Sequence, residues 1–278
     1  MEAAPGVSCK PGDGWDCRFQ RRGDHAFMTI QDFFLAYPRA ALAFSGGVDS
    51  AWLLYAGLRC GAELRPYYVK TAFQPEFEYA DALRLCRELG AEPRVLTLDA
   101  LAAEQVRENG PERCYHCKIR IMSTILAAAR EDGYPVLLDG TNASDEAGDR
   151  PGMRALAELG ILSPLRLCGL TKPEIRRLSR EAGLFTWCKP AYACLATRIR
   201  TGEPITAEKL RAVEESEDYL FSLGFSDFRV RCADNKALLQ FPAEQLEAAR
   251  AREREIRQRL SPLFAEIRID PQGRKTGL

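Results

Sequence analysis

The sequence predicts an α/β protein in which a doubly wound parallel sheet precedes a smaller α+β domain. Strands alternate with helices from about residue 40 to residue 182, which is typical of parallel βαβ units. The strands are nearly continuous apolar runs, as expected for a sheet covered on both faces. From about residue 205 the order changes to helix, strand, strand, helix, strand. We therefore expect an extension over residues 1–28, a main domain over 29–204 and a small domain over 205–278.

Hydrophobic periodicity and end signals place the individual elements. In the main domain, strands are expected at 40–44, 64–71, 95–98 and 136–140, and helices at 29–39, from about 51, at 75–90, 114–132 and 172–182. In the small domain, helices are expected at 206–222 and 243–259, and strands at 228–232, 237–241 and 265–269. Gly90 and Gly183 follow two of these helices, and Thr171 with Glu174 forms a capping box at the start of one.

Composition limits the classes of function. The chain has 278 residues, of which 46% are hydrophobic and 28% charged, as in ordinary globular proteins. No apolar run approaches the roughly 18 residues of a membrane span, and the first residues lack a secretory signal, so we expect a cytoplasmic protein without a membrane partner. Lys plus Arg and Asp plus Glu both number 39, and this balance disfavours nucleic acid as a partner. Small anionic substrates remain compatible.

The turn Ser45–Ser50, with the sequence S-G-G-V-D-S, lies between an apolar strand and a helix. Its glycines let the backbone approach a ligand, and the helix start offers free N–H groups, so the turn suits phosphate. The alternative is a turn that merely joins strand to helix. A Walker motif is excluded because no Lys follows the last glycine.

This turn resembles the PP-loop of the ATP pyrophosphatase superfamily, whose members cleave ATP between the α and β phosphates. The resemblance identifies residues 29–204 as a PP-loop domain. It implies ATP binding by Ser45, Gly46, Gly47, Val48, Asp49 and Ser50, with Asp49 near the accompanying Mg²⁺. Thr71 and Gly140 end two other predicted strands and are expected to join the ATP site.

Ten cysteines are many for a reducing compartment, so some are expected to serve metal, redox or sulfur chemistry. Cys60 and Cys86 fit apolar helical patterns and are expected in the core. Cys114 and Cys117 are three residues apart at a helix start, so both thiols should share a face where the helix dipole favours thiolates. A lone C-x-x-C motif is compatible with a structural pair, a zinc site or a redox dithiol.

Several segments together closely resemble the LarE family, ATP-dependent sulfur transferases of nickel-pincer nucleotide biosynthesis. They are Arg113–Lys118, Asp149–Leu156, Gly169–Lys172, Thr186–Arg198, Gly202–Thr206 and Arg229–Arg231, and the resemblance spans about residues 30–278. It implies that the protein adenylates a carboxylate of pyridinium-3,5-biscarboxylic acid mononucleotide and replaces an oxygen by sulfur. It also implies that Arg198, Arg229 and Arg231 bind the substrate or its phosphate. Glu217 is carried over as a polar active-site residue. For each arginine the alternative is a surface ion pair.

The chain departs from the family pattern at a few positions. Cys188 stands where Asp is expected, Arg200-Thr201 replace Pro-Tyr, and Cys232 stands where His is frequent. The end of the chain, residues 270–277, matches only loosely.

The sulfur source is expected to involve Cys114, Cys117 and Cys194. Three cysteines without a clear fourth match a [4Fe-4S] cluster with one iron not bound by protein, and that iron could carry hydrosulfide. The resemblance supports this reading, because LarE proteins divide into those that surrender sulfur from one cysteine and those with three cysteines. We favour the cluster over sacrifice of Cys194. Cys168 and Cys188 are reserve ligands, and no role is assigned to Cys9, Cys17 or Cys232.

Two other functions are compatible with parts of this pattern. PP-loop proteins with a cysteine pair and a third cysteine also thiolate tRNA, although the neutral charge and the lack of an evident RNA-binding module disfavour this. A non-catalytic protein that binds adenine nucleotides would share the loop but release no pyrophosphate. A small-molecule nucleotide is therefore the expected substrate partner, and a homo-oligomer the expected assembly.

Overall fold

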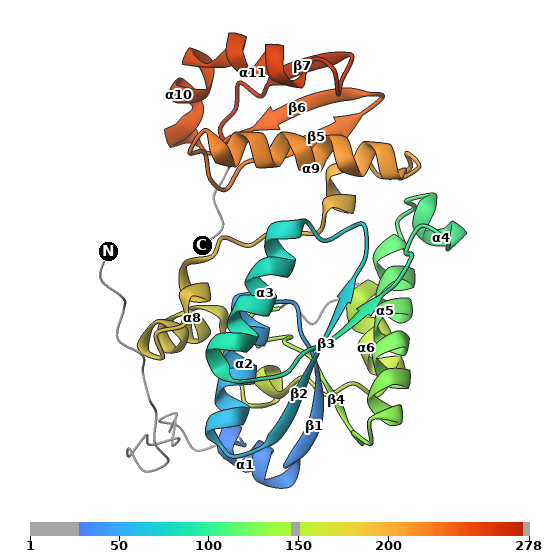
Figure 1. Ribbon diagram of the computed structural model, residues 1–278, viewed down its shortest axis with the longest axis vertical. Helices are drawn as coiled ribbons and strands as arrows, with labels where there is room; N and C mark the ends of the chain where they lie inside the picture. Colours follow the sequence, from blue (N-terminus) through green and yellow to red (C-terminus); the bar gives the residue numbers. More distant parts are fainter. Residues whose placement is uncertain (1–27, 146–150, 275–278) are drawn as a thin grey trace.

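Four parallel strands form the main sheet of the computed structural model, which describes residues 28–145 and 151–274 (Figure 1). The strand order is β3-β2-β1-β4. The strands are β1 (Arg39–Ala43), β2 (Glu63–Lys70), β3 (Arg94–Thr97) and β4 (Leu137–Leu138). Successive strands therefore run outward from β1 to β3, and β4 then returns to the other side of β1. The predicted doubly wound parallel sheet is confirmed, and its order reverses between β1 and β4.

Helices cover both faces of this sheet, as the apolar strands require. One face carries α1 (Ile30–Ala36), α2 (Val48–Arg59), α3 (Glu76–Leu89), α7 (Pro164–Leu167) and α8 (Lys172–Glu181). The other carries α5 (Arg113–Glu131) and α6 (Pro151–Glu158). Strand residues alternate between the two cores: Leu42 and Tyr68 pack in the first, and Ala41 and Tyr67 in the second.

A second sheet of three strands lies at the other end of the molecule, beyond α9 (Ala207–Ser222) (Figure 1). Its order is β5-β6-β7, with β5 (Arg229–Ala233) antiparallel to β6 (Lys236–Gln240), and β6 parallel to β7 (Glu266–Ile269). Between β6 and β7 lie η3 (Ala243–Gln245), α10 (Leu246–Ala251) and α11 (Glu253–Leu260). The expected α+β order is confirmed, but the single helix expected over 243–259 is wrong, because the chain breaks at Arg252.

The segment before α5 packs into the core of this second sheet. Ala100, Ala103 and Val106 are buried there, the last in the short helix α4 (Glu104–Arg107). Asn109 is 1% exposed and its side-chain amide donates to the carbonyls of Arg200 at 2.9 Å and Glu203 at 3.1 Å. Residues of the predicted main domain therefore pack against the predicted small domain. The domain boundary between residues 204 and 205 stays a prediction.

Local signals explain most element ends. The capping box of Thr171 and Glu174 is present, and Gly90 ends α3 in the left-handed conformation. Sequence reasoning missed α4, α6, α7 and the 3₁₀ turns η1 (Phe185–Cys188) and η2 (Leu195–Arg198). The extension, including Cys9 and Cys17, lies outside the described residues. No helix in the described part of the chain is long and apolar enough to cross a membrane.

Candidate active site

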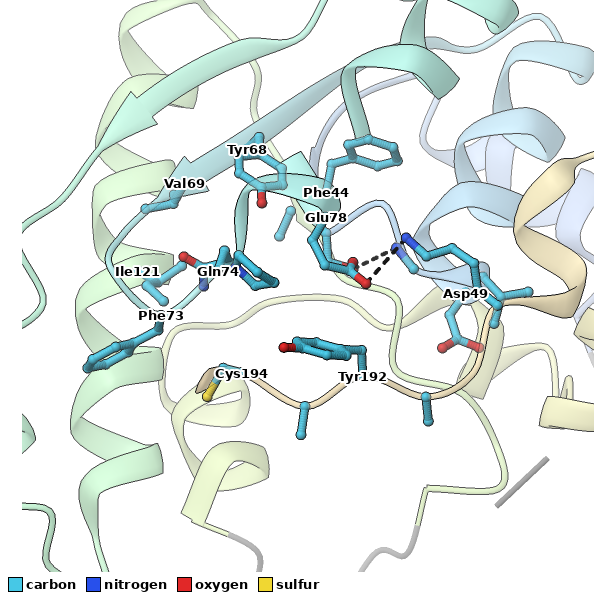
Figure 2. Close-up of a pocket in the computed structure, with 18 of the residues that line it drawn as sticks. Phe44, Asp49, Tyr68, Val69, Phe73, Gln74, Glu78, Ile121, Tyr192 and Cys194 are labelled. Atoms are coloured by element: carbon cyan, nitrogen blue, oxygen red, sulfur yellow. Dashed lines mark hydrogen bonds and ion pairs between the residues drawn. The ribbon is translucent and has the colours of Figure 1, made fainter. Parts of the chain in front are cut away.

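A cavity of about 530 Å³ lies beyond the carboxyl ends of β1 and β2. This is the edge of an open α/β sheet where ligands bind, next to the point where the strand order reverses. The Ser45–Ser50 turn lines one end of the cavity and Cys194 lines the other, with Tyr192 between Asp49 and Cys194 (Figure 2). A cavity of this size accommodates a nucleotide-sized ligand.

The Ser45–Ser50 turn is held in shape by its own side chains. The hydroxyls of Ser45 and Ser50 lie 3.1 Å apart, and the Ser45 hydroxyl also accepts from Gly47 N at 3.3 Å. Gly46 has φ +72°, and a Cβ there would lie 2.9 Å from the Cβ of Ala82 in α3. Glycine is therefore required at 46 both by the backbone and by close packing. Gly47 precedes the first turn of α2, whose N–H groups remain available to an anion.

Gly140 follows β4 and packs directly against this turn. A Cβ at 140 would lie 3.0 Å from Ser50 N, so glycine permits β4 to approach the start of α2. Thr71, the other residue expected to join the ATP site, is 4% exposed and accepts from Phe73 N at 3.0 Å. Its hydroxyl donates to Gln74, and it is Gln74 that lines the cavity. Thr71 therefore shapes the cavity wall.

Asp49 lies in the first turn of α2 and faces the cavity (Figure 2). Its carboxylate accepts from Lys172 Nζ at 2.5 Å and from Asn142 Nδ2 at 3.3 Å. Burial raises the pKa of Asp49, although the charge and hydrogen bond of Lys172 oppose this shift. A partly buried carboxylate is a hard oxygen ligand of the kind that Mg²⁺ prefers, so the residue type fits the predicted role.

Three cations that sequence reasoning did not assign also line the cavity: Lys172, Arg176 and Lys189. Lys189 pairs with Glu78 at 3.3 Å and with Asp81 at 2.7 Å. Burial raises the pKa of Glu78, and Lys189 opposes this shift. The cavity lining thus has three cations against the two carboxylates of Asp49 and Glu78, a small positive excess that suits a phosphate chain. The sequence feature that could have pointed to Lys172 is its position directly after Thr171, the residue that caps α8.

Similarity to known proteins agrees with this geometry, although no family model matches the chain. An uncharacterized protein of Synechocystis is 35% identical over 79% of this chain and 82% of its own length. The pyridinium-3,5-bisthiocarboxylic acid mononucleotide synthase of Lactiplantibacillus plantarum is 30% identical over 86% of this chain and 88% of its own length. The chain belongs to the LarE family. More distant is a tRNA-specific 2-thiouridylase of Thermotoga, 26% identical over 52% of each chain.

The segment of this LarE family member that carries Cys194, residues 187–195, is held through its backbone carbonyls. Arg176 donates to the carbonyls of Trp187 at 2.6 Å and Lys189 at 2.8 Å. Arg229 donates to the carbonyl of Ala191 at 2.5 Å, and Arg198 donates to that of Ala193 at 3.1 Å. Every second carbonyl from 187 to 193 is therefore bound by a guanidinium. We call residues 187–195 the cysteine segment.

Arg198 and Glu217, both predicted to contact substrate, pair with each other in the interior. Their side chains are 1% and 2% exposed, and Arg198 Nε donates to Glu217 Oε1 at 2.7 Å. Glu217 also accepts from Val230 N at 3.0 Å and from the hydroxyl of Tyr192. Burial, together with Glu217, raises the pKa of Tyr192. The pair thus lies behind Tyr192, which itself lines the cavity.

The other two predicted arginines differ in their exposure. Arg229 is 7% exposed, and burial lowers its pKa to about 10, with the charges of Arg198 and Arg274 adding to the shift. Arg231 is exposed and donates to Thr197 O at 2.6 Å. It lines a second cavity of about 570 Å³, between η2 and the three-stranded sheet. The fold therefore brings Arg198 and Arg229 behind the first cavity, and Arg198 also lines the second cavity together with Arg231.

The fold brings Cys194 to the start of α5, where Cys114 and Cys117 lie. The Cys194 sulfur is 3.8 Å from Nη1 of Arg113, and Cys117 and Cys194 pack against the same core. In this structure, burial opposes the thiolate expected at Cys117. Burial raises its pKa to about 12, and the neighbouring Cys194 adds to the shift. Desolvation is the largest cause, and the charge of Arg113 opposes it.

The three thiols are not arranged as a metal site. Within residues 28–145 and 151–274, no set of three His, Cys, Asp or Glu side chains could hold a metal ion. The donor types suit a [4Fe-4S] cluster but their placement does not fit one, so the cluster stays a prediction. Cys168 and Cys86 are buried in the first core, which Cys60 also contacts, and Cys232 is buried in the core of the three-stranded sheet. Cys188 is exposed in η1.

Proposed function

We propose that this chain is an ATP-dependent sulfur transferase of nickel-pincer nucleotide biosynthesis. Its substrate would be pyridinium-3,5-biscarboxylic acid mononucleotide, and its product the corresponding bisthiocarboxylic nucleotide. The observation that carries the proposal is one cavity with the Ser45–Ser50 turn at one end and Cys194 at the other. The Lactiplantibacillus plantarum relative, whose name states this product, supports it across most of the chain. We place the reaction in the cytoplasm.

The two ends of the cavity suit two successive steps. A substrate carboxylate oxygen attacks the α phosphorus of ATP, the bond to the β phosphate breaks, and pyrophosphate leaves. The N–H groups at the start of α2, with Lys172, Arg176 and Lys189, are placed to hold the phosphates. Asp49 would hold the Mg²⁺ that neutralises their charge. The product of this step is an acyl adenylate, whose AMP is a good leaving group.

Sulfur then replaces the activated oxygen. A sulfur nucleophile attacks the acyl carbon, the bond from that carbon to the AMP oxygen breaks, and AMP departs with the oxygen. If Cys194 is the nucleophile, a thioester forms, and removal of its Cα proton breaks the Cβ–S bond to leave dehydroalanine and a thiocarboxylate. The cysteine segment would hold Cys194 within reach of the adenylate. The cluster hypothesis predicts instead that Cys194 survives many turnovers.

Product analysis tests the first step. The wild-type chain, incubated with ATP, Mg²⁺ and the biscarboxylic nucleotide, should form AMP and pyrophosphate. Ser45→Ala and Asp49→Ala should abolish both products while circular dichroism shows a folded chain. Formation of ADP and phosphate by the wild type would refute the assignment, and ATP binding without cleavage would favour a non-catalytic nucleotide-binding protein.

The fate of Cys194 tests the second step. After one turnover without iron, mass spectrometry should find dehydroalanine at 194 if the thiol is sacrificed. Multiple turnovers with added sulfide, dependent on iron reconstitution and on Cys114 and Cys117, would support the cluster. The matched control is Cys188→Ser, because Cys188 lies in the same segment but outside the cavity lining.

A tRNA substrate is the competing proposal, because a probable tRNA sulfurtransferase of Moorella thermoacetica is 26% identical over 74% of this chain. That match spans 54% of the relative, so nearly half of the relative has no counterpart in it. A balanced charge also argues against binding to tRNA. Salt-dependent tRNA binding at micromolar affinity, with no thiolation of the biscarboxylic nucleotide, would overturn our preference.

A further inference from the structure

The hydroxyl of Tyr68 has no hydrogen-bond partner within the described part of the chain. Tyr68 lies in β2, is 2% exposed and lines the cavity, and its hydroxyl points into that cavity (Figure 2). An unpartnered buried hydroxyl costs about 1–3 kcal/mol. Native proteins keep few such groups, and each calls for an explanation, such as a bound water or ligand.

Neighbouring side chains fix the ring of Tyr68 in place. Its centroid lies 5.3 Å from that of Tyr79 in α3, and it packs in the first core. Burial raises the pKa of Tyr68 well above its ordinary value, and the carboxylates of Glu78 and Glu76 add to the shift. The hydroxyl therefore stays protonated and is available as a donor. A donor held in position before binding loses little conformational freedom when a ligand arrives.

The register of the sheet places this donor beside the glycine turn. Ala43 pairs with Tyr67, and Phe44 N donates to Tyr67 O at 2.9 Å. Tyr68 therefore lies next to Phe44, directly before Ser45. Glu78 lies near Tyr68 in the cavity wall and pairs with Lys189 (Figure 2). Tyr68 and the turn line the same cavity, so a ligand whose phosphates rest on the turn would have this hydroxyl within the same space.

We propose that Tyr68 donates a hydrogen bond to the adenine nucleotide bound in this cavity and is a specificity-determining residue for it. The inference rests on the proposed function, because it takes ATP as the ligand of the Ser45–Ser50 turn. The acceptor is an oxygen or nitrogen of the nucleotide, on its phosphates, ribose or base. The bound nucleotide thereby satisfies the hydroxyl that is unpartnered in the free chain.

Tyr68→Phe tests this, because it removes the hydroxyl and leaves the ring. Calorimetric titration of the full chain with α,β-methylene-ATP and Mg²⁺ should show affinity weakened about 3- to 10-fold, the size of one net hydrogen bond. The unfolding temperature without nucleotide should stay equal or rise, because the variant loses an unsatisfied polar group. A residue with a purely structural role would not give these opposite effects.

Tyr134→Phe is the matched control. Tyr134 is 9% exposed, lies outside the cavity lining, and its hydroxyl donates to Glu63 at 3.1 Å. Its removal should lower the unfolding temperature and leave nucleotide affinity within about two-fold of the wild type. Repeating the Tyr68→Phe titrations with ADP, AMP and adenosine identifies the acceptor, because the penalty disappears once the contacted group is missing.

The outcomes separate the inference from the proposed function. Equal affinities of the wild type and Tyr68→Phe would overturn the inference alone. A folded wild-type chain that binds no α,β-methylene-ATP would overturn the proposed function and this inference with it. A lower unfolding temperature for Tyr68→Phe without nucleotide would show a partner for the hydroxyl inside the free chain and would also overturn the inference.

Discussion

The buried pair of Arg198 and Glu217 can be tested by removing one charge at a time. Glu217→Ala leaves the guanidinium of Arg198, 1% exposed, without its counter-charge. It also removes the acceptor for Val230 N and for the Tyr192 hydroxyl. Breaking a buried ion pair from one side costs about 3–5 kcal/mol, because the remaining charge is buried and uncompensated. At about 2–4 °C per kcal/mol for a chain of this order of size, the unfolding temperature should fall by about 10 °C.

Thermal unfolding followed by circular dichroism measures this change. The control is Glu253→Ala, which breaks the exposed pair with Arg257 in α11 and should cost about 0.5 kcal/mol or less. The double variant Arg198→Met, Glu217→Leu should recover most of the loss, since it leaves no buried charge. A Glu217→Ala cost below about 1 kcal/mol, equal to the surface control, would refute the reasoning, and Arg198 would then be available to substrate as the resemblance implied.

Three further predictions follow from the cavity. Gly46→Ala should lower the free energy of unfolding by at least about 1 kcal/mol more than Gly61→Ala does. Both glycines have positive φ, but of the two only position 46 would bring a Cβ to 2.9 Å from Ala82. Equal losses in urea titrations would contradict the packing argument. Burial raises the pKa of Asp49, so the folded chain binds the Asp49 proton more readily than the unfolded chain does, and the contribution of Asp49 to stability should fall as pH rises from below 3.8 through the raised pKa. Asp49→Asn should remove this contribution, so equal slopes of stability against pH in the variant and the wild type would contradict the prediction. Arg176→Gln should speed alkylation of Cys194 several-fold, because it releases the carbonyls of Trp187 and Lys189. The control Arg177→Gln affects the exposed pair with Glu181 and should leave the rate unchanged. Equal alkylation rates of the two variants, measured by mass spectrometry, would show that Arg176 does not hold the cysteine segment.

The main sheet could be predicted because its signals are local. Continuous apolar strands, alternating helices and the Thr171 cap each depend on residues close in sequence. The Ser45–Ser50 turn was recognisable for the same reason, since strand, glycines and helix start lie within a few residues. Its packing was not, because the contact of Gly46 with Ala82 joins residues far apart in the chain.

Short elements and long-range pairs escaped prediction for physical reasons. The strand expected at 136–140 is present as β4, although it has only two residues. The close approach of Gly140 to Ser50 could not be predicted, because the two residues lie far apart in the chain. The helix expected over 243–259 reads as continuous because its charged face is periodic on both sides of Arg252, where the backbone leaves helical geometry. The role of Lys172 beside Asp49 depends on two segments 123 positions apart.

The arginines show most clearly what sequence cannot decide. A guanidinium binds phosphate, a carboxylate or a backbone carbonyl with the same donors, so the residue type alone does not select the partner. In the free chain Arg198 uses its donors on Glu217, Thr197 and Ala193, and Arg229 uses its donors on the loop around Phe228 and on Ala191. Two residues predicted to hold substrate therefore hold the segment that presents Cys194. A substrate phosphate that recruited either arginine would compete with those carbonyls, so binding of the acceptor and placement of the sulfur atom would be energetically coupled.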